Sequence, residues 1–308
     1  MNKIIIGSRG SKLALWQANY IKKELKRIHK NLTVEIKTIK TKGDKVLDKA
    51  LSKIGDKSLF TKELEEELLI NKIDIAVHSL KDLETTLPKG LKLSVVTKRH
   101  PVEDVLIARK KKITLTSLPE NAVVATGSLR RKSQLLHIRP DITVKDLRGN
   151  VPTRISKFLK SNWDAIILAR AGVERLKLKK YISSYIKTYE IVPAVGQGAL
   201  GIEINKNNKK AEALINPLHD ENTFQEISAE RAFLKTLGGG CQVPVGAHAQ
   251  IKSNGLYLSG IIASLDGETT YSKKIRGKKF DAEKLGISLA KDLLKAGAKK
   301  ILNEIYSG

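Results

Sequence analysis

Short apolar runs alternate with longer amphipathic segments along the first two thirds of the chain. Continuous apolar runs predict strands, and apolar residues spaced three or four apart predict helices. We expect strands at residues 3–6, 33–40, 73–77, 91–96, 105–108, 122–125, 144–147 and 165–169. We expect helices at residues 13–28, from Thr61 onwards, at 129–138 and at 151–159. This alternation predicts α/β layers whose strands pair largely in parallel.

The order of elements changes after Pro217. A predicted helix over 223–237 is followed by strands within 244–276 and by a long terminal helix over 282–305. This order predicts a separate, smaller α+β unit. Two α/β units joined by crossing segments also predict a cleft between domains, where ligand sites commonly lie.

The composition is that of a folded protein large enough for two or three domains, with 308 residues of which 41% are hydrophobic. The first apolar run, Ile4 to Ile6, is far shorter than the core of a signal peptide, and no later run approaches a membrane span. One cysteine excludes an intrachain disulfide and fits a reducing compartment. We therefore expect a cytoplasmic protein without a membrane partner.

Arginine is clustered in this chain, whereas lysine is scattered. The formal net charge is +25, and seven of the 13 arginines lie between Arg130 and Arg175. Scattered lysine is typical of a solvated surface, but the planar arginine fork binds carboxylate or phosphate through two parallel hydrogen bonds. No aromatic stacking positions accompany the arginines, so the pattern favours a small anionic ligand over nucleic acid.

Two predicted strand ends in the first 100 residues carry candidate ligand-binding groups. Arg9 and Ser11 lie in a Gly-Ser-Arg-Gly-Ser turn between strand and helix, whose N–H groups suit an anion. An ordinary turn with Ser11 as N-cap is the alternative. Ser79, Lys81 and Asp82 follow the strand over 73–77, at the edge where α/β sheets bind ligands. A solvent-exposed Lys–Asp pair is the alternative there.

The clustered arginines occupy later turns of the same kind. Thr126 and Ser128 bracket a turn, and Arg130 and Arg131 lie in the first turn of the helix that follows. Cations oppose the helix dipole at this place unless an anion lies in front of them. The further candidates are Arg148, Arg154 and Arg175. Each arginine alone is explained as solvated, but the set predicts a carboxylate or phosphate site.

The only cysteine, Cys241, follows three glycines. The glycines give the backbone freedom and exposed N–H groups, which favour a reactive thiol of lowered pKa. A small buried hydrophobic residue is the alternative for a lone cysteine. One cysteine cannot form a thiolate zinc cluster and the six histidines lack ligand spacing, so we expect no metal site.

Taken together and in order, these segments resemble the porphobilinogen deaminase family along essentially the whole chain. The matching segments are residues 7–9, 13–18, 59–65, 74–82, 128–131, 147–150, 196–199 and 239–241. The resemblance implies two α/β domains like type 2 periplasmic binding proteins flanking a cleft, plus a smaller α+β C-terminal domain. The implied boundaries are 1–99 with 199–217, 103–193, and 222–308, the last carrying Cys241.

The resemblance also implies a dipyrromethane cofactor, built by the enzyme from its own substrate and held in thioether linkage to Cys241. On it, the family condenses four porphobilinogen molecules head to tail and releases ammonia each time. Hydrolysis then frees hydroxymethylbilane. Each porphobilinogen carries an acetate and a propionate, so a growing chain needs many cationic partners.

Matching the family's motifs residue by residue implies three roles. The catalytic pair is Asp82 and Lys81. The cofactor-binding set is Cys241, Arg130, Arg131, Ser128 and Thr126, again with Lys81 and Asp82. The substrate-binding set is Arg9, Ser11, Arg148, Arg154, Arg175 and Ser79. The chain departs from the family's pattern at Gly127, where many relatives carry a hydroxyl, and at Arg170, where small apolar residues are usual.

Two other classes of protein remain as alternatives. A non-catalytic anion-binding protein of the periplasmic type explains the arginines but not Cys241 on its glycine loop. A nucleic-acid-binding protein rests on the net charge alone. Polar residues 42–58 predict a mobile cover over the site, with an ordinary solvent loop as the alternative. We expect a monomer.

Overall fold

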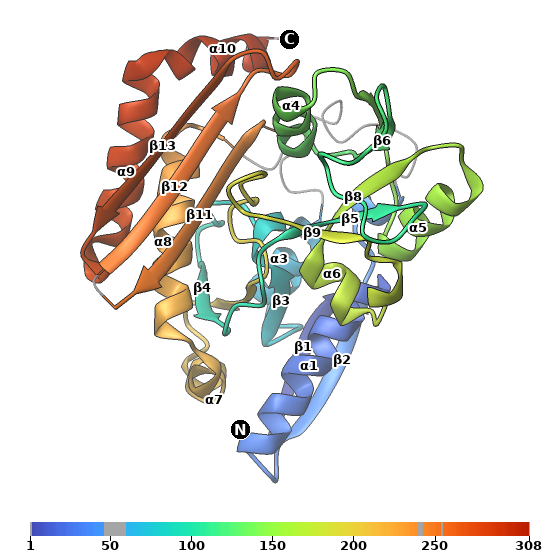
Figure 1. Cartoon of the computed structure of the whole chain (residues 1–308). Helices are drawn as coiled ribbons and strands as arrows, with labels where there is room; N and C mark the ends of the chain where they lie inside the picture. Colours follow the sequence, from blue (N-terminus) through green and yellow to red (C-terminus); the bar gives the residue numbers. More distant parts are fainter. Residues whose placement is uncertain (1, 46–59, 240–242, 254, 308) are drawn as a thin grey trace. The chain divides into compact units, whose positions relative to one another are not determined.

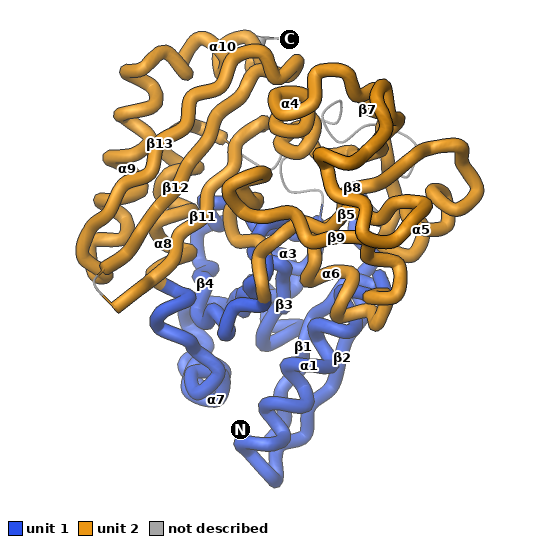
Figure 2. The backbone as a smooth tube through the Cα atoms, viewed as in Figure 1, with its two compact units in different colours: residues 1–47, 56–100, 198–224 blue, residues 48–55, 101–197, 225–308 orange. Residues whose placement is uncertain are grey.

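The computed structural model describes residues 2–45, 60–239, 243–253 and 255–307 (Figure 1). The chain divides into two compact units (Figure 2). Unit 1 comprises residues 1–47, 56–100 and 198–224. Unit 2 comprises residues 48–55, 101–197 and 225–308. The chain therefore passes between the units more than once, and each unit is built from separate stretches of sequence.

Unit 1 contains a five-stranded sheet with strand order β2-β1-β3-β10-β4. Its strands are β1 (Lys3–Arg9), β2 (Thr33–Ile39), β3 (Ile75–Ser79), β4 (Leu91–Val96) and β10 (Leu200–Asn205). Its helices are α1 (Lys12–Ile28), the short α2 (Lys42–Lys45), α3 (Lys62–Leu69) and α7 (Lys209–Ile215), with the 3-10 turns η2 (Leu80–Asp82) and η4 (Asn216–Leu218). Strand β1 pairs in parallel with β2 and β3, whereas β10 runs antiparallel to β3 and β4.

Helices cover both faces of this sheet because successive strand residues point to opposite sides. Ile4 and Ile6 of β1 belong to the core that packs against α1 and α7. Ile5, between them, packs with the core formed around Leu64 and Leu68 of α3. The buried alternation in β1 thus fixes two layers of helix around one sheet.

Unit 2 contains a second five-stranded sheet, with strand order β7-β6-β8-β5-β9. Its strands are β5 (Asp104–Ala108), β6 (Val123–Ala125), β7 (Thr143–Lys145), β8 (Ala165–Ala169) and β9 (Ser184–Ile186). Its helices are α4 (Leu129–Ile138), α5 (Val151–Lys160), α6 (Arg170–Arg175) and the 3-10 turn η3 (Lys179–Tyr181). Leu135 of α4 packs in one of its two cores, and Phe158 of α5 packs in the other.

The two sheets share one plan, which corrects the expectation of largely parallel pairing. In each sheet the strand next to the edge, β10 or β5, runs antiparallel to both of its neighbours. Strand β10 follows the crossing into unit 1 at Gly198, and β5 follows the crossing into unit 2 at Pro101. These strands reach their sheets from the other unit rather than through a helical crossover, so parallel pairing is not required.

The rest of unit 2 is the α+β part that the sequence predicts. Helix α8 (Glu221–Thr236) leads into an antiparallel sheet of β11 (Val245–Lys252), β12 (Gly255–Ala263) and β13 (Thr270–Gly277). After the 3-10 turn η5 (Lys279–Asp281), α9 (Ala282–Leu293) packs on this sheet with Phe233 of α8 in one core. The two α/β layers and the smaller α+β part confirm the predicted fold class.

The long terminal helix predicted over 282–305 is wrong in one respect, since it is interrupted. A π-helical turn, η6 (Leu294–Ala298), separates α9 from α10 (Lys299–Ser307). Gly297 has φ of 120°, and a Cβ there would lie 2.5 Å from the Tyr271 hydroxyl. Only glycine accommodates both conditions, so the helix breaks at this residue.

The predicted three-domain boundaries stay a prediction, because the second and third predicted domains both belong to unit 2. Among the described residues, the short helices α2, α6 and α7 and the strand β9 were not predicted. Within the described part of the chain, no helix is long and apolar enough to cross a membrane.

Candidate active site

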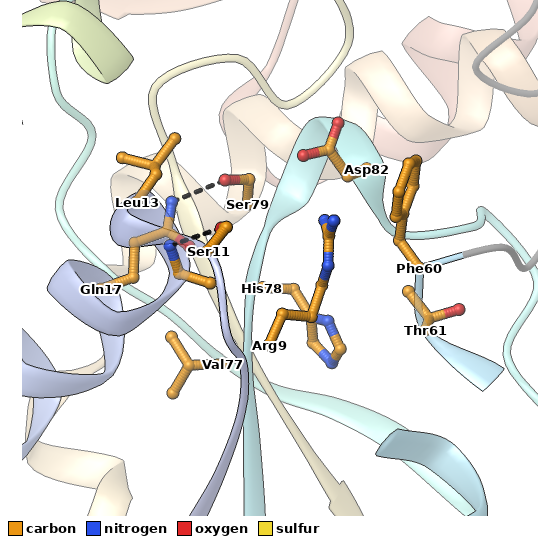
Figure 3. Close-up of a pocket in the computed structure, with 11 residues that line it drawn as sticks. Arg9, Ser11, Leu13, Gln17, Phe60, Thr61, Val77, His78, Ser79 and Asp82 are labelled. Carbon is orange, nitrogen blue, oxygen red and sulfur yellow. Dashed lines mark hydrogen bonds between the residues drawn. The ribbon is translucent and has the colours of Figure 1, made fainter. Parts of the chain in front are cut away.

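A pocket in unit 1 gathers the ends of two neighbouring parallel strands (Figure 3). Arg9 ends β1, and Ser79 ends β3 and is followed by Asp82 in η2. The pocket is lined by Arg9, Ser11, Leu13, Ala14, Gln17, Phe60, Thr61, Val77, His78, Ser79 and Asp82. Four of the residues predicted from the sequence therefore share one pocket, namely Arg9, Ser11, Ser79 and Asp82. Lys81 lies in the same 3-10 turn as Asp82.

Ser11 caps helix α1, as the alternative interpretation of this turn predicted. Its Oγ accepts a hydrogen bond from the backbone N–H of Ala14 at 3.2 Å. Capping does not exclude ligand binding, because Ser11 also lines the pocket. Helix α1 begins beside the pocket, and the dipole at a helix N-terminus favours an anion.

Arg9 is held against an aromatic ring at the pocket. Its guanidinium carbon lies 4.1 Å from the centroid of the Phe60 ring. Figure 3 shows the Arg9 side chain extending towards Asp82 and Phe60. A cation over an aromatic face is stabilised and keeps its charge.

Gln17 is a pocket residue whose part the sequence did not reveal. It is 3% exposed, and its Nε2 donates to Ser79 Oγ at 2.6 Å, which joins α1 to the end of β3 (Figure 3). The only sequence signal was its place in the Leu-Trp-Gln-Ala segment at the start of the helix. The bond fixes the orientation of the Ser79 hydroxyl.

A buried ionisable cluster begins at the pocket lining, with His78. His78 of β3 has its Nε2 3.0 Å from Glu203 Oε2 of β10, and both side chains are almost fully buried. Glu65 of α3 is 5% exposed. Burial raises the pKa of the Glu65 carboxyl, and the neighbouring Glu203 carboxylate raises it further.

Arg130 and Arg131 in unit 2 are bound to a buried carboxylate of the same chain. Arg130 Nη2 donates to Asp104 Oδ2 at 2.8 Å, and Arg131 Nη2 donates to Oδ1 at 2.7 Å. Burial alone would raise the pKa of Asp104, but the two guanidinium groups outweigh it and hold that pKa well below its ordinary value. Two cations in the first turn of a helix oppose its dipole unless an anion lies in front of them, and Asp104 is that anion.

The turns that carry the other unit 2 candidates lie next to each other. Thr126 is 3% exposed, and its Oγ1 accepts from the backbone N–H of Ser128 at 3.3 Å. At Gly127 an added Cβ would lie 2.6 Å from the Leu147 carbonyl oxygen, so the hydroxyl residue common in the family would not fit without movement. This close approach brings the Thr126–Ser128 turn beside Arg148.

The four remaining arginines differ in what they contact. Burial lowers the pKa of Arg148, and its Nη1 has no hydrogen-bond partner among the described residues. Arg154 Nε donates to the Gly149 carbonyl at 2.7 Å, and Arg175 ends α6. Arg170, whose role was open, pairs with Glu103 at 3.4 Å and Glu174 at 3.1 Å. Arg170 thus belongs to an ion-pair network rather than to the predicted ligand set.

Two predicted features fall outside the described residues. Cys241, the proposed attachment point, is one of them. The cover predicted over residues 42–58 is described only at its start, where Lys42–Lys45 form the short helix α2. Both expectations stay predictions.

These observations define an α/β protein with a strand-end pocket and buried arginines suited to a carboxylate-bearing ligand. A model described as "Porphobilinogen deaminase, dipyromethane cofactor binding domain" matches residues 4–213, and "Porphobilinogen deaminase, C-terminal domain" matches residues 224–295. The chain belongs to the porphobilinogen deaminase family. It is therefore an enzyme of tetrapyrrole biosynthesis that acts on porphobilinogen, and the non-catalytic alternative is not favoured.

Curated relatives match almost end to end. The porphobilinogen deaminase of Carboxydothermus hydrogenoformans is 49% identical over 303 residues, covering 98% of this chain and 97% of its own. That of Prochlorococcus marinus is 50% identical over 306 residues, covering 99% and 96%. That of Chloroherpeton thalassium is 47% identical over 306 residues, covering 98% and 97%.

Solved structures that align with the chain are distant. The VFT2 domain of Bordetella pertussis BvgS shares 13% identity with a TM-score of 0.42, covering 70% of this chain and 84% of that one. The alkanesulfonate-binding protein SsuA of Xanthomonas axonopodis pv. citri, bound to MOPS, shares 14% identity with a TM-score of 0.38, covering 74% of each chain.

The family's dipyrromethane cofactor is an acidic group, and the buried donors of unit 2 fit it. Arg130 Nε, Arg131 Nε and Arg148 Nη1 are buried without a hydrogen-bond partner in the described part of the chain. Buried donors left unpaired are costly, and a carboxylate would satisfy them. The chain has one thiol for a thioether, that of Cys241.

Proposed function

We propose that Asp82 is the catalytic carboxylate of this enzyme, with Lys81 beside it, and that Arg9, Ser11 and Ser79 bind substrate in the same pocket. The observation that carries the proposal is that Arg9 and Asp82, which are 73 residues apart in the sequence, line one pocket at neighbouring strand ends. A cation that binds a carboxylate and an anion that stabilises positive charge are thereby held in one place.

The reaction needs both charges. As the C–N bond of the substrate's aminomethyl group breaks and ammonia leaves, positive charge develops on the methylene carbon. The Asp82 carboxylate stabilises that charge and orients the pyrrole N–H. The acceptor ring, when bound, would supply the carbon for the new C–C bond, and that carbon would lose its proton. Arg9, oriented by Phe60, binds the substrate's carboxylates and holds the methylene carbon in register.

The bound dipyrromethane supplies the acceptor ring and tethers the product chain until hydrolysis releases hydroxymethylbilane. We propose that Cys241 holds it covalently and that Arg130, Arg131, Ser128 and Thr126 bind its side chains. The growing chain adds carboxylates with each unit, for which Arg148, Arg154 and Arg175 are the proposed partners. Support comes from the buried donors of Arg130, Arg131 and Arg148 that have no partner among the described residues.

We propose further that the enzyme works as a monomer in the cytoplasm. The single cysteine is compatible with a reducing compartment. Light scattering of the purified protein tests the first statement, and a dimer mass would contradict it.

The test of the catalytic assignment is steady-state kinetics on Asp82→Asn and Asp82→Glu. The Asn variant keeps size but loses charge, so kcat should fall on the order of a hundredfold or more, while KM changes far less. The Glu variant keeps the charge but displaces it, so an intermediate loss is expected. Intact mass must first confirm that both variants carry the cofactor. A loaded Asn variant with nearly normal kcat would place the catalytic carboxylate elsewhere.

A further inference from the structure

The two arginines assigned to the cofactor are held by a residue that no motif assignment includes. We propose that Asp104 is a positioning residue for cofactor binding. It fixes the guanidinium groups of Arg130 and Arg131 so that their Nε–H groups remain as donors for a cofactor carboxylate, and Gln197 holds Asp104 in place. The inference rests on the proposed role of these arginines and deepens it.

Asp104 is enclosed by donors from different parts of unit 2. Its side chain is fully buried at the start of β5 and accepts from Arg130 Nη2 at 2.8 Å and Arg131 Nη2 at 2.7 Å. Gln197 Nε2 donates to Asp104 Oδ1 at 2.9 Å. Both oxygens are thus committed to named donors, so the carboxylate has little freedom to move.

The other terminal nitrogen of each arginine is also committed. Arg130 Nη1 donates to the Val192 carbonyl at 2.7 Å, and Arg131 Nη1 donates to the Ile167 carbonyl at 3.2 Å. Each guanidinium plane is therefore fixed at two points. A planar group fixed at two points has one orientation, which is what bidentate recognition requires.

The Nε atoms of both arginines are the donors left over. Each is buried without a hydrogen-bond partner among the described residues, although both arginines are only 4% exposed. A purely structural ion pair would be expected to satisfy its buried donors. Two unpaired donors of the same kind, on adjacent residues, point to a ligand that accepts hydrogen bonds.

The charge of the group supports the same conclusion. Two guanidinium groups and one carboxylate leave one positive charge in a buried setting, at the first turn of α4, where the helix dipole is already positive. An isolated buried charge is costly, whereas a cofactor carboxylate would neutralise it. Asp104 therefore neutralises part of the charge and leaves the remainder for the ligand.

Gln197 connects this group to the point where the chain crosses between units. Its Nε2 also donates to the Val102 carbonyl at 2.6 Å, so it bridges the two ends of the 101–197 stretch of unit 2. Val102 lies just after the crossing at Pro101 and two residues before Asp104, and Gln197 is the last residue before the crossing at Gly198. The bridge holds the start of β5, and with it Asp104, against the arginines.

The test measures the rate at which purified apo-protein acquires the adduct mass when incubated with porphobilinogen. Asp104→Asn keeps the shape but replaces an acceptor oxygen by an NH₂ group that faces a guanidinium. Its loading rate should fall on the order of tenfold or more, as expected for losing a desolvated charged contact. Asp104→Glu keeps the charge and should recover part of the rate.

Because Asp104→Asn leaves two buried cations poorly paired and could fail to fold, Gln197→Leu is the second variant. It removes only the bridge and should slow loading by a smaller factor. The matched control is Asn208→Leu, which also removes a side-chain amide, one that caps α7 and donates to Asp74 within unit 1, and which bonds neither Asp104 nor the two arginines. Asn208→Leu should lower the melting temperature while loading at the normal rate.

The outcomes separate the two claims. If the wild-type apo-protein acquires no adduct, the proposed function itself fails. If the wild type loads, and folded Gln197→Leu and Asp104 variants load as fast as it does, Asp104 is structural only and the positioning role is wrong. Slow loading in the Asn208→Leu control by the same factor would also overturn the inference, since any loss of stability would then explain the effect.

Discussion

At the scale of single residues, the arginines of this chain differ in their partners. Arg170 is paired with two glutamates, and Arg139 is paired with Asp141, so both serve the fold. Arg9 lies over an aromatic ring, and Arg148 keeps a buried nitrogen without a partner in the described residues. A buried cation with an unpaired donor, as at Arg148, is placed to bind a carboxylate.

This grouping predicts a graded effect of arginine substitution. Arg148→Leu should stop the enzyme at the cofactor or at an early addition, because losing a desolvated charged contact costs on the order of 2–5 kcal/mol. Mass spectrometry of the enzyme after mixing with substrate should show which complex accumulates. The control is Arg27→Leu, which removes an exposed arginine paired with Glu24 and should leave turnover unchanged. Normal turnover in Arg148→Leu, without a stalled complex, would contradict the assignment.

The sequence could identify these arginines but not their partners. Arg130 and Asp104 are 26 residues apart, Gln17 and Ser79 are 62 apart, and His78 and Glu203 are 125 apart. No local pattern links such pairs, because they meet only when helices and strands from different stretches of the chain pack together. The need for an anion near Arg130 followed from the helix dipole, whereas the residue that supplies it did not.

At the scale of elements, the spacing of hydrophobic residues was sufficient to predict the bounds of a helix or strand that buries a regular face. The bounds of β4, β8 and α4 match the predicted ranges residue for residue. The prediction of one continuous terminal helix failed at Gly297, because the sequence pattern does not show that this glycine has a positive φ. Pairing direction failed for β5 and β10 because it depends on where the chain comes from rather than on the strand's own residues.

Helix α3 carries a prediction about pH. The pKa of Glu65 is raised in the folded protein, so the folded state binds more protons than the unfolded state, and stability should fall as pH rises from the unfolded pKa of about 4.3 through the raised folded pKa. Glu65→Gln removes this titration. The free energy of unfolding of the variant, relative to wild type, should therefore rise as pH increases from the unfolded pKa through the raised folded pKa.

Denaturant titrations at several pH values measure this difference. Glu66→Gln is the control, since Glu66 is the next residue of α3 and is exposed. Its difference from wild type should not change with pH in the same way. A Glu65→Gln difference that stays flat across the range, or falls as pH rises, would mean that the pKa of the Glu65 carboxyl is not raised in the folded protein.

At the scale of the whole molecule, two α/β sheets of one plan carry the residues proposed above for substrate and cofactor. Unit 1 presents Asp82 and Arg9 at strand ends, and unit 2 presents Arg130, Arg131 and Arg148. The fold class and the family could both be predicted from ordered motifs. The boundaries of the three expected domains came from the resemblance to the family, and they stay a prediction.

The central claim is that this chain builds porphobilinogen into a linear product on a dipyrromethane held by Cys241. Intact-mass measurement of the purified protein tests it most directly, with wild type and Cys241→Ser compared side by side. The account predicts that wild type exceeds its sequence mass by one dipyrromethane and gains further units on mixing with porphobilinogen, whereas Cys241→Ser has its sequence mass and negligible activity. A wild type without the adduct, or a Cys241→Ser protein that carries it, would contradict the account.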